Sequence, residues 1–122
     1  MPNKHRGEIT IELGEYRYPA APTYKALAEI ESTMGPLLPV AQQLHAGNFG
    51  LREVCSVLTA CIRAACDNPK DAPTYDEIAE LVVEEGLNVT GKPVQAMIEL
   101  VAAYLSPKSK DEGKAEGSPS AP

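Results

Sequence analysis

Three cysteines have the richest potential chemistry in this chain, and all of them lie in one segment. Cys55, Cys61 and Cys66 follow one another at spacings of six and five residues. Zinc ligands usually come in pairs about two to four residues apart, and one helix cannot bend back to gather these thiols. We therefore interpret the cysteines as small apolar side chains of a protein in a reducing, cytoplasmic compartment, and we expect no metal or other cofactor.

The other ionisable residues show no catalytic pattern. His5 and His45 are far apart, and neither has a neighbouring cysteine or a serine placed as a nucleophile. A dyad with a residue that is close only in space remains open. Glu84 and Glu85 are adjacent, so on a helix they point to different sides, and general acid–base catalysis needs a pocket that shifts a pKa. We predict that the chain is not an enzyme.

The candidate ion and phosphate sites are incomplete. The segment with Asp67, Asn68 and Asp71 lacks the central glycine and the final glutamate of a calcium loop. The glycines form no phosphate-binding pattern, and Lys92 at a helix start is only a weak signal for an anion. We expect no small-molecule substrate.

The charge of the chain disfavours nucleic acid and anionic membranes as partners. The net charge is −6 at pH 7, and residues 106–122 are neutral, so the negative excess lies on residues 1–105. A helix-turn-helix over residues 75–105 would present Lys92 and Gln95 but also Glu99, whereas groove-reading helices need basic or amide side chains. No apolar run approaches the ~18 residues of a membrane span, and none follows the basic N-terminus as in a signal peptide.

The element that positions the others is predicted at residues 51–66 (LREVCSVLTACIRAAC). Its apolar residues recur with the period of a helix and form one stripe centred on Leu58. Arg52, Thr59 and Arg63 lie on the opposite side. The apolar stripe of such an amphipathic helix must be covered by other elements.

One hairpin and four further helices are predicted around this segment. Residues 8–13 alternate polar and apolar side chains, and a glycine-led turn at 14–15 leads into a second strand at 16–18, which Pro19 ends. N-caps at Thr23 and Thr74, together with apolar periodicity, predict helices at about residues 23–34, 36–46, 74–85 and 93–105.

The predicted fold class is mainly α (α+β), with an N-terminal β-hairpin, a bundle of about five short helices and a disordered C-terminal tail. We expect a single domain over residues 8–105. A flexible N-terminus at residues 1–7 and a tail at residues 106–122 with almost no apolar content flank it. The core must be aliphatic, because aromatic residues make up only 5% of the chain.

The N-terminal block HRGEITIELGEYRYPAAPTYKALAEIESTMG resembles the gene transfer agent family of small phage-tail proteins. The features that carry the resemblance follow in order: His5-Arg6-Gly7-Glu8, an alternating strand, Leu13-Gly14, a short second strand, Pro22-Thr23-Tyr24 and the segment ALAEIE at 26–31. A looser similarity continues to Val54. Members of the family look like tail assembly chaperones and are also described as tail tube proteins.

The resemblance implies an assembly chaperone that binds the long helical tape-measure protein of a phage-like tail before tube subunits enclose it. Such a role requires apolar surface in addition to the core, and four apolar residues lie off the main stripes of their helices. We expect these residues to contact the partner: Leu38, Val57, Leu81 and Val83. The alternative is a compact bundle that buries them from several sides.

Other roles remain open from the sequence. A structural tail tube subunit should form rings and expose a long strand edge, for which one short hairpin offers little sheet. A small cytoplasmic regulator should show a pocket with converging polar groups. Self-association and a frameshifted longer product remain open as well.

Overall fold

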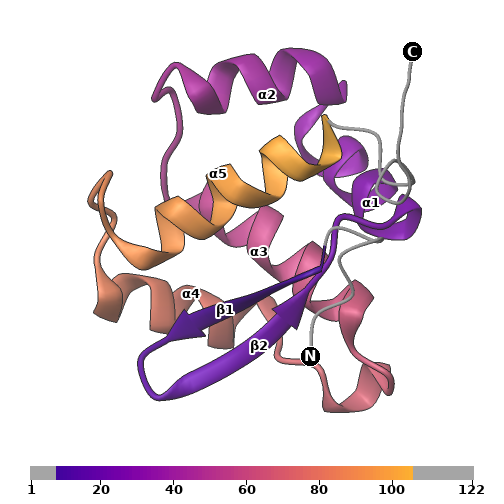
Figure 1. Cartoon of the computed structure of the whole chain (residues 1–122), viewed down its shortest axis with the longest axis vertical. Coiled ribbons are helices and arrows are strands. Elements are labelled where there is room, and N and C mark those ends of the chain that lie inside the picture. The colour runs from indigo at the N-terminus through magenta and orange to yellow at the C-terminus, as the bar shows by residue number, and fades with distance from the viewer. Residues whose placement is uncertain (1–7, 106–122) are drawn as a thin grey trace, which may run out of the picture.

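The computed structural model describes residues 8–105, apart from the side chain of Pro69, and it confirms the predicted fold class (Figure 1). The expected flexible N-terminus and disordered tail lie outside the described residues. The elements follow one another in this order: β1 (Ile9–Leu13), β2 (Tyr16–Ala20), α1 (Tyr24–Met34), α2 (Leu37–His45), α3 (Leu51–Ala65), the 3₁₀ turn η2 (Pro69–Asp71), α4 (Tyr75–Glu85) and α5 (Lys92–Tyr104).

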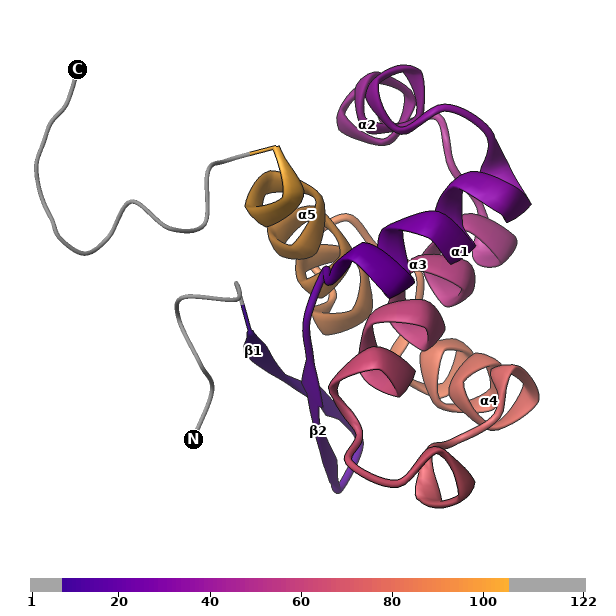
Figure 2. The same ribbon diagram turned by 90° about the vertical axis from the view of Figure 1, so that its right-hand side faces the viewer.

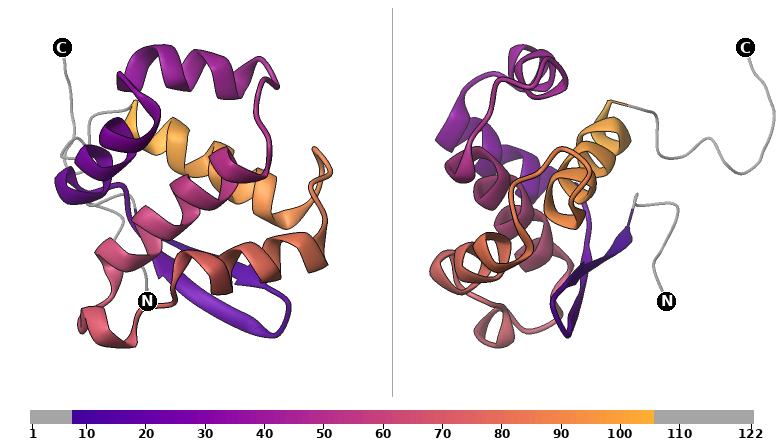
Figure 3. Two further views of the ribbon diagram at one scale, coloured as in Figure 1. Left: turned by 180° about the vertical axis from the view of Figure 1, so that it is seen from behind. Right: turned by 90° about the vertical axis from the view of Figure 1, so that its left-hand side faces the viewer.

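Helix α3 lies at the centre of the fold, with α1, α4, α5 and β2 packed around it (Figure 3). Leu58 is 0% exposed, as the periodicity predicts. Thr59 was expected on the exposed side but is only 6% exposed, because it lies between side chains of α1 and α4. The central helix is therefore buried around more of its circumference than one apolar stripe indicates.

The hairpin is longer than predicted. β1 and β2 pair antiparallel from Leu13–Tyr16, beside the turn, to Ile9–Ala20, so the expectation that Pro19 ends the second strand is wrong. Hydrogen-bonded and non-hydrogen-bonded pairs alternate along such a ladder, and the pair that closes a two-residue turn is hydrogen-bonded. Pro19 therefore occupies a position whose backbone nitrogen faces away from β1, where no N–H is needed.

Long-range polar contacts attach the hairpin to the ends of two helices. The turn residue Gly14 has φ = 64°, a conformation that glycine adopts without strain, and its N–H donates to Glu85 Oε2 at the end of α4, at 2.8 Å. On the hairpin face that carries Glu12 and Arg17, Lys92 Nζ at the start of α5 donates to Glu12 Oε1 at 3.0 Å. This contact, with Arg17 nearby, lowers the pKa of Glu12.

Helix α2 lies at one end of the molecule, and the hairpin and α4 lie at the other (Figures 1 and 2). α2 contacts α1 and α5, and the Tyr104 hydroxyl of α5 donates to the Leu37 carbonyl at 3.0 Å. Within residues 8–105, no helix combines the length and apolarity that crossing a membrane requires.

Candidate partner-binding groove

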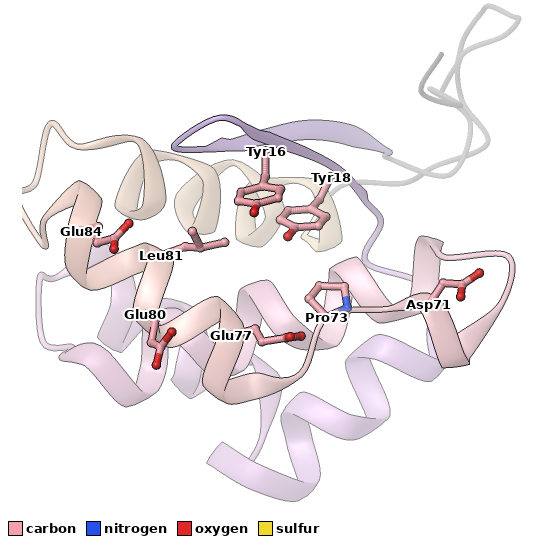
Figure 4. A pocket seen from close by; sticks show the side chains of 8 residues that line it. All are labelled: Tyr16, Tyr18, Asp71, Pro73, Glu77, Glu80, Leu81 and Glu84. Atoms are coloured by element: carbon pink, nitrogen blue, oxygen red, sulfur yellow. The ribbon is translucent and has the colours of Figure 1, made fainter.

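A groove of about 360 Å³ lies between the hairpin and α4 (Figure 4). We call it the hairpin–α4 groove. Three segments of the chain supply its lining: Tyr16 and Tyr18 from β2, Asp71 at the end of η2 with Pro73 just after it, and Glu77, Glu80, Leu81 and Glu84 from α4.

The two tyrosines form the hairpin side of the groove. Their rings stack with centroids 6.1 Å apart and planes 9° from parallel. In the register of the hairpin, Tyr16 lies opposite Leu13 and Tyr18 opposite Ile11, so these four side chains share one face. Leu13 is 0% exposed because α4 and α5 pack against β1, whereas Tyr16 on β2 is 53% exposed. Helices thus cover one half of the face, and the other half opens to the groove.

One face of α4 forms the opposite side. The lining residues of α4 lie along one stripe of the helix, because Glu80, Leu81 and Glu84 follow Glu77 by three, four and seven residues. The start of this stripe is held by reciprocal bonds at the cap: the Thr74 N–H donates to Glu77 Oε1 at 2.9 Å, and the Glu77 N–H donates to Thr74 Oγ1 at 3.2 Å. Leu81 points toward the tyrosines in Figure 4.

The groove is electronegative. Its eight lining residues include four carboxylates and no basic side chain. Glu80 and Glu84 form no ion pair with any residue from 8 to 105. Partial burial raises the pKa of Tyr18, and Tyr16 and Glu77 add to the effect. Because the faces of aromatic rings are also negative, both sides of the groove attract cations.

The structure does not bring the four predicted contact residues together. Leu81 lines the hairpin–α4 groove, and Val83, 59% exposed, lies elsewhere on α4. Leu38, 66% exposed on α2, lines a second pocket of about 400 Å³ whose other residues include Leu105. Val57 is 1% exposed in the core, where several elements cover it, so it is not available at the surface.

Sequence reasoning missed the aromatic and acidic residues of the groove. Two signals were present, namely tyrosines two residues apart in a strand and carboxylates three and four residues apart in a helix. Neither pattern indicates the other, because about 60 residues of chain separate the two segments and only packing makes them face each other.

The residues with potential chemistry are dispersed. Cys55 and Cys61 are buried, and burial raises the pKa of the Cys55 thiol to about 11. Cys66 is half-buried, and its thiol donates to the Asn68 carbonyl at 3.1 Å. In the part of the chain that the structure describes, no three His, Cys, Asp or Glu side chains are placed to hold a metal ion. His45 is exposed and lines the pocket beside Leu38.

Comparison with known protein families matches residues 6–107 to the family described as phage tail tube protein, GTA-gp10. The match includes every strand and helix of the structure. No curated protein and no solved structure matches the chain significantly. The resemblance seen in the N-terminal block is thereby confirmed. The chain belongs to the phage tail tube protein family GTA-gp10, a family of tail structural and assembly proteins and not of enzymes.

Proposed function

We propose that this protein is a tail assembly chaperone that binds the tape-measure protein of a gene transfer agent or related phage-like tail. Family membership supplies the association with tail components. The observation that carries the chaperone role is the hairpin–α4 groove, where the exposed Tyr16 and the half-buried Tyr18 and Leu81 lie beside a row of carboxylates. Exposed apolar surface with a polar rim is typical of sites that bind other polypeptides.

The groove suits a partner that is a long helix with exposed apolar side chains. Tyr16, Tyr18 and Leu81 offer contact area for such side chains, and aromatic residues contribute strongly to binding in interfaces of this kind. The surrounding carboxylates keep the surface hydrated until the partner arrives. Two additional proposed contacts are Leu38, exposed on α2, and Val83, exposed on α4 outside the groove.

A structural tail tube subunit is the second candidate, because the family description names that role. A tube wall needs strands that pair from one subunit to the next. Within residues 8–105 the sheet consists of one hairpin with strands of five residues each. Pro19 lies on the outer edge of β2 and removes a donor that pairing would use, so the sheet supports the chaperone role better.

Co-expression with the tape-measure protein from the same gene cluster tests the proposal. We expect the tape-measure protein to remain in the supernatant and to co-purify with this chain. A Leu58→Asp variant, which places an unpaired charge in the core and should not fold, is the control for nonspecific effects of co-expression. A tape-measure protein that stays insoluble and unbound would exclude the chaperone role, and rings or polymers of the chain alone in light scattering would favour the tube subunit.

A further inference from the structure

We propose that the hairpin–α4 groove binds a partner segment through a lysine or arginine side chain, which lies between the tyrosine rings and the carboxylates of α4. The proposal rests on the proposed function, because the basic segment is expected to belong to the tape-measure protein. It adds the site and the chemistry by which that partner is recognised.

The dimensions of the groove fit side chains from one face of a segment. Its volume of about 360 Å³ is near the lower end of the range for ligand pockets, about 300–1,000 Å³. Leu81 and Pro73 provide apolar contacts between the carboxylates. Lysine and arginine carry an aliphatic stem below the charged group, so one such side chain can cover these apolar atoms and reach the carboxylates.

The carboxylates of α4 favour a cationic occupant. Glu80 lies three residues after Glu77 and four residues before Glu84, and like charges at these spacings destabilise a helix. A bound cation removes this repulsion. The same cation gains attraction from the rings of Tyr16 and Tyr18, which lie across the groove from α4 in Figure 4.

The basic residues of the hairpin and α5 are engaged elsewhere. Arg17 and Lys92 both pair with Glu12, on the hairpin face that points away from the groove. The contacts of Glu12 with Lys92 and of Gly14 with Glu85 also hold the hairpin in place relative to α5 and α4. The groove is therefore already formed before a partner binds, which lowers the entropic cost of binding.

The central test is the double variant Glu80→Gln/Glu84→Gln, which removes the unpaired carboxylates and keeps their shape. The dissociation constant for the tape-measure protein should rise about five- to tenfold near 50 mM salt, and the difference should shrink near 500 mM because salt screens exposed charges. A matched control is Glu31→Gln/Glu99→Gln, which removes two exposed carboxylates from α1 and α5. The control variant should bind within about twofold of the wild type.

Two further measurements separate recognition from folding. Tyr16→Leu keeps an apolar side chain but removes the aromatic face, and it should weaken binding about three- to tenfold. Glu80→Gln/Glu84→Gln should melt at the same temperature as the wild type or higher, since repulsion within α4 is relieved. Weaker binding combined with unchanged or greater stability is the expected signature of a binding site.

The outcomes distinguish this proposal from the broader one. If the wild type binds the tape-measure protein and Glu80→Gln/Glu84→Gln binds equally well, the groove assignment is wrong and the chaperone role stands. Equal weakening by the control variant would show a general charge effect and would also overturn the assignment. A groove variant that changes only the oligomeric state would show that a second copy of the chain occupies the groove. Absence of binding by the wild type would reject the proposed function itself.

Discussion

Replacing Leu58 with alanine should lower the free energy of unfolding by about 3–5 kcal/mol, because it opens a hole at the centre of the fold. Leu58 is 0% exposed, and α3, which carries it, packs against α1, α4, α5 and β2. The lost isopropyl group is equivalent to roughly three methylenes at about 0.8 kcal/mol each, or ~2.4 kcal/mol. The remainder is the cavity term, which stays large because elements on several sides keep the hole from collapsing.

Urea denaturation followed by circular dichroism measures this change. Domains of this size are usually stable by about 5–15 kcal/mol, so the substitution should remove a large share of the free energy of unfolding. If the denaturant slope is about 1.5 kcal/mol per molar urea, the midpoint should fall by about 2–3 M without a change in slope.

Leu38→Ala is the matched control, because it removes the same atoms from a side chain that is 66% exposed on α2. Its free energy of unfolding should stay within about 0.5 kcal/mol of the wild type. A loss of less than about 1 kcal/mol in Leu58→Ala would refute the assignment of α3 as the centre of packing.

Three further predictions concern individual side chains. A thiol reagent should modify Cys66 in the folded protein and reach the two buried cysteines only after unfolding, and rapid modification of all three thiols in native buffer would contradict their burial. The Glu53 carboxylate accepts the Gly50 N–H at 2.8 Å, and this hydrogen bond lowers the pKa of Glu53 below 4.5. The ionised carboxylate therefore stabilises α3 above pH 4.5, and this stabilisation is lost as the pH falls through the lowered pKa. In denaturation experiments, Glu53→Ala should therefore lower the free energy of unfolding by about 1 kcal/mol near neutral pH and by much less near pH 3. A difference from the wild type that is the same at both pH values would contradict this. The hydrogen bond from Lys92 lowers the pKa of the Glu12 carboxyl from 4.5, and NMR titration should detect this shift. Lys92→Met should return the pKa of Glu12 toward 4.5, and a pKa that is the same in the variant and the wild type would show that the pair is not formed in solution.

Local signals were sufficient for most of the secondary structure. Thr23 and Thr74 were predicted to cap helices, and each hydroxyl accepts a backbone N–H three residues later, at 3.2 Å. The error at Pro19 came from treating proline as the end of a strand, although an edge position tolerates it. The error at Val57 came from assigning one buried stripe to a helix that is covered on several sides.

The candidate groove could be predicted only in fragments. Leu81 was singled out because it lies off the apolar stripe of its helix, and it does line the groove. The same reasoning selected Leu38, which lies in a different pocket, because position on a helix says nothing about which element stands opposite. Tyr16 and Tyr18 were assigned to a strand without any role, since their exposure depends on how far the helices cover the hairpin.

The positions of most helices and strands, the aliphatic core and the family of the chain can all be inferred from residue order alone. These properties follow from caps, periodicity and residue order, all of which act over a few neighbouring residues. Three features depend on long-range packing: β2 faces α4, Gly14 and Lys92 attach the hairpin to helices more than 70 residues away, and carboxylates collect beside two tyrosines. Burial of the apolar faces around α3 sets the relative positions of these segments, and the groove forms where their uncovered faces meet.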